Sequence, residues 1–121
     1  MAKGSRGGKR GGGNVSASKE MSQYNFSGTE KQVAWANDIV GGAWGTIERN
    51  FNNARANAEK YPSEREFFKS DAATWLQVAS GYRDATHGIT SAKQIIDERG
   101  RYDSSAVIRA FNALSQRKKG R

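Results

Sequence analysis

The sequence predicts an all-α protein, a small bundle of about five helices with disordered basic tails at the N-terminus (residues 1–28) and the C-terminus (residues 116–121). Three observations support this fold class. Only one of the 121 residues is proline, apolar residues recur every three or four positions, and several Ser or Thr residues precede a Gln or Glu by three positions, as in a helix-capping box. A chain of this length accommodates one compact domain. We expect that domain to span residues 29–115.

Residues 1–28 are expected to form a disordered basic tail. The first 14 residues carry no large apolar side chain, and seven of the 14 glycines lie before residue 29. Such a segment has little apolar surface to bury and a high entropic cost of ordering. The triplets Arg6-Gly7-Gly8 and Arg10-Gly11-Gly12 resemble RGG-type segments that follow single-stranded nucleic acid. The alternative is a basic tail that only adds solubility.

Two helices are predicted between residues 29 and 61. Thr29 and Gln32 have capping-box spacing and open a helix from about 29 to 40, which Gly41 and Gly42 should break or bend. The second helix should span about 43–61, because six apolar residues at spacings of 3, 4, 3, 4 and 3 share one face: Trp44, Ile47, Phe51, Ala54, Ala58 and Tyr61.

Three further helices are predicted after Pro62. Ser63 and Glu66 have the spacing of a cap for a helix ending near Gly81, and the segment 82–90 should be a loop. Ser91 and Gln94 should cap a short helix that ends at Gly100. The last helix should begin after Asp103 or Ser104 and carry an apolar face of Val107, Ile108, Phe111 and Leu114.

The net charge of +8 belongs entirely to the two ends of the chain. Residues 1–28 contain five basic residues and one acidic residue, and residues 116–121 contain four basic residues and no acidic one. The intervening segment has 11 of each sign and is neutral. Basic ends on a neutral body favour contacts with phosphate. The nucleic-acid-binding residues we predict are Lys3, Arg6, Lys9, Arg10, Arg117, Lys118, Lys119 and Arg121.

The inventory of reactive side chains argues against an enzyme. There is no cysteine, and the one histidine, His87, lies in a polar stretch where a solvated turn residue is the ordinary interpretation. We expect no metal and no cofactor. No apolar run approaches the roughly 18–20 residues that cross a bilayer, so no membrane contact is expected. The N-terminus lacks the apolar stretch of a secretory signal, which favours the cytoplasm.

The tryptophans and the arginines near Gly100 are the remaining candidate contact residues. Trp44 and Trp75 lie on apolar helix faces and should be core residues, whereas Trp35 lies off its helix's apolar line and is a candidate surface contact. Arg99, Arg101 and Arg109 are candidates for a basic edge beside the C-terminal tail, offset by the acidic residues Asp97, Glu98 and Asp103. The segment around Gly100 fits an ordinary helical hairpin better than a DNA-binding helix-turn-helix, because Ile96 stands where that motif needs a small residue.

Two segments resemble small phage and mobile-element proteins. Residues 29–36 match a Thr-x-Lys-Gln-x-x-Trp-Ala pattern that often begins the first helix of such proteins, and residues 92–99, AKQIIDER, are similar to a second segment of that group, although an aromatic residue is more usual at Ile95. The start MAKGSRGGKRGGG also looks like the start of some phage proteins. The resemblance implies an accessory protein, including the kind that inhibits CRISPR nucleases. It assigns no functional residue.

These observations lead to one hypothesis and two alternatives. The first is a non-enzymatic phage or mobile-element protein that binds DNA or RNA nonspecifically through its basic tails, in the host cytoplasm. The alternatives are a protein-binding, anti-CRISPR-like inhibitor of a host nucleic-acid-binding defence factor, and a virion or assembly component. The sequence does not indicate an oligomeric state.

Overall fold

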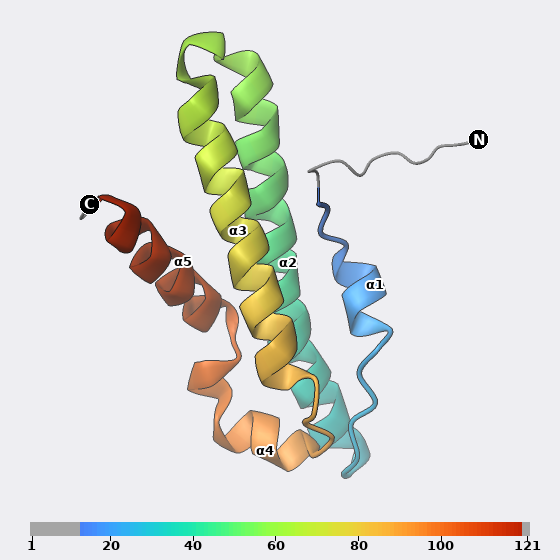
Figure 1. The fold of residues 1–121 in the computed structure, drawn as a ribbon. Coiled ribbons are helices and arrows are strands. Elements are labelled where there is room, and N and C mark those ends of the chain that lie inside the picture. The colour runs from blue at the N-terminus through green and yellow to red at the C-terminus, as the bar shows by residue number, and fades with distance from the viewer. Residues whose placement is uncertain (1–12, 120–121) are drawn as a thin grey trace.

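The structure, a computed structural model, describes residues 13–119, with side chains up to Arg117. Over this range the all-α prediction is confirmed (Figure 1). The α-helices are α1 (Ala17–Met21), α2 (Glu30–Lys60), α3 (Arg65–Thr86), α4 (Ala92–Asp97) and α5 (Ser104–Lys119), and 3-10 turns at Pro62–Glu64 and Arg99–Arg101 connect neighbouring helices. The predicted tails fall partly on residues 1–12 and 120–121, which lie outside the described range.

A long antiparallel hairpin of α2 and α3 is the scaffold of the fold (Figure 1). Thr29 and Gln32 form the predicted capping box at the start of α2, with both reciprocal hydrogen bonds present. The chain reverses through Pro62–Glu64. The predicted Ser63 cap is absent, because the hairpin turn occupies that position and α3 begins only at Arg65. The short helices and α5 pack around the lower half of the hairpin.

The predicted break at Gly41 and Gly42 is wrong, because α2 is one continuous helix of 31 residues. A glycine in a helix costs about 1 kcal/mol relative to alanine. Here Val40, Ala43 and Trp44, which flank the pair, are completely buried. Burial of large side chains contributes about 1.5–3 kcal/mol each and offsets that cost. Packing on both sides of the glycines therefore keeps the helix intact.

The predicted loop from Tyr82 to Thr90 is also wrong in its first half. Helix α3 continues past Gly81 to Thr86, and Tyr82 and Thr86 are both buried. The Tyr82 hydroxyl donates a hydrogen bond of 2.6 Å to the Tyr102 carbonyl, and the Thr86 hydroxyl donates one of 2.9 Å to the Tyr82 carbonyl. These contacts extend the buried stripe of α3 by one more turn.

The last two helices begin as predicted, but α5 ends later. Ser91 caps α4 through the Gln94 N–H, and the Asp103 carboxylate accepts a hydrogen bond of 3.0 Å from the Ala106 N–H at the start of α5. Helix α5 runs to Lys119, beyond the predicted end of the helical domain at residue 115. Part of the predicted C-terminal tail is thus helical, and Arg117 belongs to α5 instead of to a flexible end.

The segment 13–28 is ordered, contrary to the prediction of a tail extending to residue 28. It contains α1, and its side chains Val15 and Phe26 are buried in the common core. Ser27 forms an isolated parallel bridge with Ser91, and its N–H donates a hydrogen bond of 2.7 Å to the Thr90 carbonyl. Burial of Val15 and Phe26 offsets the entropic cost of ordering this segment.

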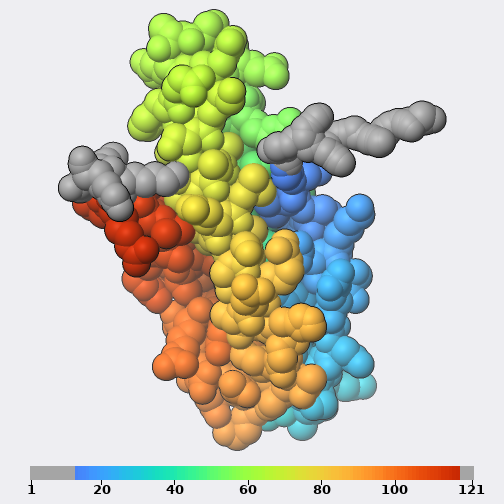
Figure 2. Space-filling model, viewed as in Figure 1, coloured from blue at the N-terminus to red at the C-terminus, as the bar shows by residue number. Residues whose placement is uncertain are grey.

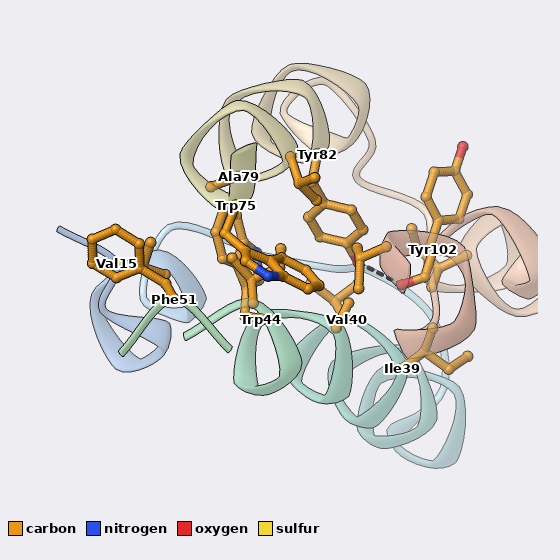
Figure 3. Close-up of a cluster of buried hydrophobic side chains, with 14 of the residues drawn as sticks. Val15, Ile39, Val40, Trp44, Phe51, Trp75, Ala79, Tyr82 and Tyr102 are labelled. Carbon is orange, nitrogen blue, oxygen red and sulfur yellow. Dashed lines mark hydrogen bonds between the residues drawn. The ribbon is translucent and has the colours of Figure 1, made fainter. Parts of the chain in front are cut away.

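The core centres on Trp44, which is fully buried (Figure 3). The Tyr82 ring meets its indole edge-on, with ring centroids 5.3 Å apart. The indole N–H donates a hydrogen bond of 2.9 Å to the Tyr24 hydroxyl, which also lies 2.6 Å from the Thr86 hydroxyl. Trp75 is buried as well and stacks on Phe111 of α5 at 4.4 Å. The core assignment of both tryptophans is confirmed.

Candidate nucleic-acid interface

Most of the predicted nucleic-acid-binding residues cannot be placed on the surface. The residues outside the described range, or without a described side chain, are Lys3, Arg6, Lys9, Arg10, Lys118, Lys119 and Arg121. Arg117 is exposed on the last described turns of α5. Helix α5 contains basic residues and no acidic residue, so the charge of its C-terminal part has no compensating carboxylate within the helix.

The structure brings Trp35 and Arg99 together. Trp35 is 48% exposed, and the Arg99 guanidinium lies 5.3 Å from the centroid of its ring. Arg99 also donates a hydrogen bond of 2.8 Å to the Ile96 carbonyl, which fixes the guanidinium in place. Cation–π contacts at exposed positions contribute about 0.5–1 kcal/mol. The pair places a cation over an exposed ring, and the exposure of Trp35 is compatible with the predicted surface contact.

Arg101 belongs to a different place, a groove between α3 and α5, which we call the α3–α5 groove. The hollow measures about 540 Å³, and the charged residues among its described lining are Arg101 and Arg117. Its walls are made of small side chains, including Gly81, Ala85 and Ala110. In Figure 1, α5 diverges from α3 toward its C-terminal end. The predicted basic edge of Arg99 and Arg101 is therefore split between two surfaces.

A second groove lies between α2 and α3, beside Gly13, and we call it the N-terminal groove. It measures about 630 Å³. Its charged lining residues are Arg55, Glu59, Arg65 and Lys69. Sequence reasoning missed this cluster because the residues occupy two helices, and only the hairpin turn brings them to one surface. Locally, each cation is offset by a nearby carboxylate in the sequence, so no charge run indicated the site.

The apex of the hairpin, residues 61–68, exposes aromatic side chains. Tyr61 is 45% exposed and Phe67 is 56% exposed. Ring centroids are 6.0 Å apart for Tyr61 and Phe68, and 5.1 Å apart for Phe67 and Phe68. The Lys60 ammonium lies 5.5 Å from the Tyr61 ring. Figure 2 shows the apex standing clear of the other elements.

The titratable groups with shifted pKa values serve the fold. Burial raises the pKa of Tyr82 and of Tyr102 above the ordinary tyrosine range, and the hydrogen bond from Ser105 lowers the pKa of Asp103. The hydrogen-bonded Glu20 carboxylate, 2.6 Å away, raises the pKa of Arg83. His87 ends α3 and is exposed. Each shifted group caps a helix or joins two elements.

Across residues 13–119, no group of three His, Cys, Asp or Glu side chains could hold a metal ion. None of the described helices combines the length and the apolar character needed to cross a bilayer. No protein-family model, curated protein or solved structure that was compared with the chain matches it. The candidate interface is therefore identified from the charges, grooves and exposed rings of this chain.

Proposed function

We propose that this protein is a non-enzymatic nucleic-acid-binding protein that holds DNA or RNA nonspecifically through its basic ends. The observation that supports the proposal is the distribution of charge. All of the net charge of +8 lies in residues 1–28 and 116–121, while residues 29–115 are neutral. Lysine and arginine release condensed counterions when they neutralise phosphates, and this gain does not depend on base sequence.

This distribution gives the helical body and the basic ends different roles. The helical body holds the two basic ends at fixed points, Gly13 in the N-terminal groove and the C-terminal turns of α5 beside the α3–α5 groove. Arginine in the Arg-Gly-Gly triplets offers a planar donor fork to phosphate and a flat face to bases. Contacts of this type position a protein on nucleic acid without reading sequence.

Charge neutralisation tests the proposal without shortening the chain. One variant replaces Lys3, Arg6, Lys9 and Arg10 by Gln, and a second does the same at Arg117, Lys118, Lys119 and Arg121. The matched control replaces four exposed cations of the neutral segment 29–115: Lys31, Arg49, Lys93 and Arg109. Binding of a fluorescent oligonucleotide is measured between 50 and 200 mM salt. Each lost phosphate contact should reduce the salt slope by about 0.7 for single strands. Equal affinity of all three variants would contradict the proposal.

A protein-binding inhibitor is the second candidate, and the α3–α5 groove is the feature that favours it. Val78, Val107 and Leu114 line the groove together with Arg101 and Arg117. An apolar floor with cations at the rim suits an acidic amphipathic helix of a partner, such as a host defence factor. The test is capture of a partner from nuclease-treated host lysate. Ala110→Trp, which fills the groove, should abolish that capture and leave oligonucleotide binding unchanged.

A further inference from the structure

Trp35 is the exposed tryptophan of the chain. Its side chain is 48% exposed, whereas Trp44 and Trp75 are buried. It lies in the second turn of α2, at the base of the hairpin, where α4 and the turn Arg99–Arg101 pack beside the helix (Figure 1). The fold therefore leaves about half of a large flat ring in contact with solvent, where a ligand can reach it.

Arg99 is fixed against this ring. Its guanidinium carbon lies 5.3 Å from the centroid of the Trp35 ring, and its Nη1 donates a hydrogen bond of 2.8 Å to the Ile96 carbonyl. A side chain that is already held in place loses less conformational entropy when a ligand binds. The ring and the charge thus form one preorganised unit, which we call the Trp35–Arg99 pair.

The charge of Arg99 is available to an anion. Among the described side chains, none of the carboxylates lies within 4.0 Å of its guanidinium. The two acidic residues that precede it are engaged elsewhere. Asp97 lies 2.6 Å from the Lys93 ammonium, and Glu98 accepts a hydrogen bond of 3.2 Å from the Tyr102 hydroxyl. The hydrogen bond to the main chain therefore orients Arg99 without neutralising it.

The surface next to Arg99 is open. Gly100 is exposed, and a Cβ added there would meet no heavy atom within 4 Å. Asp38, which is also exposed, follows Trp35 by three positions on α2 and is its neighbour on the helix surface. A negatively charged group is repelled on the side of Asp38 and attracted on the side of Arg99. An anionic ligand should therefore approach the ring from the side of Arg99 and Gly100.

A nucleotide matches both parts of the pair. Its base presents a flat π-face to an aromatic ring, and its phosphate carries negative charge close to that face. Such stacking tolerates any base, and arginine adds phosphate contacts and cation–π contacts. In a duplex the bases are stacked on one another, so an unpaired base is needed to meet Trp35. A partner protein could cover the same apolar area, but it would not require a π-face.

We infer that the Trp35–Arg99 pair is a stacking site for an unpaired base of DNA or RNA, with the base on the exposed part of the indole and a neighbouring phosphate against Arg99. The inference rests on the proposed function and names its substrate class, a strand with unpaired bases. It places a contact on the helical body, which has no net charge over residues 29–115. Stacking there adds affinity that charge neutralisation at the two ends does not supply.

Two substitutions of Trp35 separate base stacking from apolar contact. Trp35→Phe keeps an aromatic ring, whereas Trp35→Leu keeps apolar volume and has no π-face. For the cation, Arg99→Gln is compared with Arg49→Gln. Arg49 is also exposed and also donates a side-chain hydrogen bond, of 3.4 Å, to the Thr46 hydroxyl. It lies about 21 Å from Trp35 along α2, beyond the Debye length of about 10 Å at 0.1 M salt. Thermal unfolding verifies that each variant folds.

The measurement is the affinity for dT and U oligonucleotides of about 16 nucleotides, for an abasic strand and for a duplex of equal length, at 0.1 M salt. Trp35→Leu should weaken binding of the dT and U strands roughly 5- to 150-fold, the range of one stacked base, and Trp35→Phe should retain most of the affinity. The abasic strand should bind the full chain and Trp35→Leu equally. The dT and U arms show whether DNA, RNA or both are bound.

The salt dependence and the fluorescence report on the two parts of the pair separately. Arg99→Gln should weaken binding about 5-fold and reduce the salt slope by about 0.7, the effect of one lost phosphate contact, and Arg49→Gln should show neither change. A base stacked on an indole quenches its emission. Binding of dT should therefore quench the full chain and leave the emission of Trp35→Phe, which retains Trp44 and Trp75, unchanged.

Different failures have different meanings. If the full chain binds the strands but Trp35→Leu and Trp35→Phe have equal affinity, or Arg99→Gln matches Arg49→Gln, the stacking site is overturned. The proposed function then stands if the Gln variants of the two ends lose affinity in the same assay. Tighter binding of the duplex than of the single strand, or weaker binding of the abasic strand by Trp35→Leu, would also overturn the site. If the full chain binds no oligonucleotide, both the proposed function and this inference are wrong.

Discussion

The two ends of the α2–α3 hairpin differ in how their side chains are used. At the base, Trp44 is enclosed by the N-terminal segment and α3, and its N–H, the Tyr24 hydroxyl and the Thr86 hydroxyl form one connected polar chain. At the apex, residues 61–67 are all exposed and other elements do not cover them (Figure 1). Stability is therefore concentrated at the base, and the apex is left available for contacts with other molecules.

Trp44→Ala should give the largest effect, because it empties the centre of the base. Truncation of a buried tryptophan costs about 3–5 kcal/mol through lost burial and the cavity left behind. Total stability of a domain of this size is about 5–15 kcal/mol. Urea unfolding monitored by circular dichroism measures the loss. Trp35→Ala, at a half-exposed site, should cost less than about 1 kcal/mol, and similar losses in both variants would contradict the comparison.

Tyr24→Phe tests the polar chain of the base. It leaves the buried Trp44 N–H without its hydrogen-bond acceptor, which costs about 1–3 kcal/mol. The Thr86 hydroxyl retains its bond to the Tyr82 carbonyl. The same substitution at the apex, Tyr61→Phe, should change stability by less than about 0.5 kcal/mol. A free energy of unfolding equal to that of the unmodified protein in Tyr24→Phe would show that water satisfies the indole N–H.

Asp103→Ala should destabilise α5 by about 1 kcal/mol at neutral pH, because the carboxylate caps the Ala106 N–H. Hydrogen bonding lowers the pKa of Asp103, so its ionised form is favoured in the folded state. Its contribution is present above the unfolded pKa of about 3.9 and is lost as the pH falls through the lower folded value. Unfolding at pH 7 and pH 2.5 measures this. Asp103→Asn should retain most of the cap at both pH values.

Gly42→Ala should stabilise the protein slightly. Gly42 is exposed inside α2, and an added Cβ would meet no heavy atom within 4 Å. Alanine lowers the entropic cost of a helical position by about 0.5–1 kcal/mol. Thermal unfolding should show a higher midpoint. A lower midpoint would mean that α2 depends on a bend at this position, as the sequence suggested.

Phe67→Ala should have the smallest effect. The side chain is more than half exposed at the apex, and substitutions at such sites usually change stability by less than about 0.5 kcal/mol. Urea unfolding of this variant beside Trp44→Ala gives the two extremes of the comparison. A loss above about 2 kcal/mol would show that the apex rings stabilise the hairpin, and that they are not free for other contacts.

Local sequence patterns predicted most of the fold. They failed for elements that are ordered by contacts between residues distant in sequence. The capping pair Thr29 and Gln32 and the stripe from Trp44 to Ala58 identified the helical residues of α2, but as two helices instead of one. The continuation of α3 was visible in principle, because Tyr82 and Thr86 extend the spacing of Trp75 and Val78. The sequence did not reveal that residues 13–28 are ordered. Val15 and Phe26 are isolated apolar residues, and the core residues they pack against lie far along the chain.

For the candidate sites too, some features were visible in the sequence and others only in the tertiary structure. The order of residues along the chain by itself determined the all-α class and the concentration of net charge at the two ends, because both depend on which residues follow one another. Only the tertiary structure joined Arg55 to Arg65 and Lys69, separated Arg99 from Arg101, and left Tyr61 exposed. A surface made by two helices depends on how the chain turns between them, and residues distant in sequence share no local pattern that could reveal it.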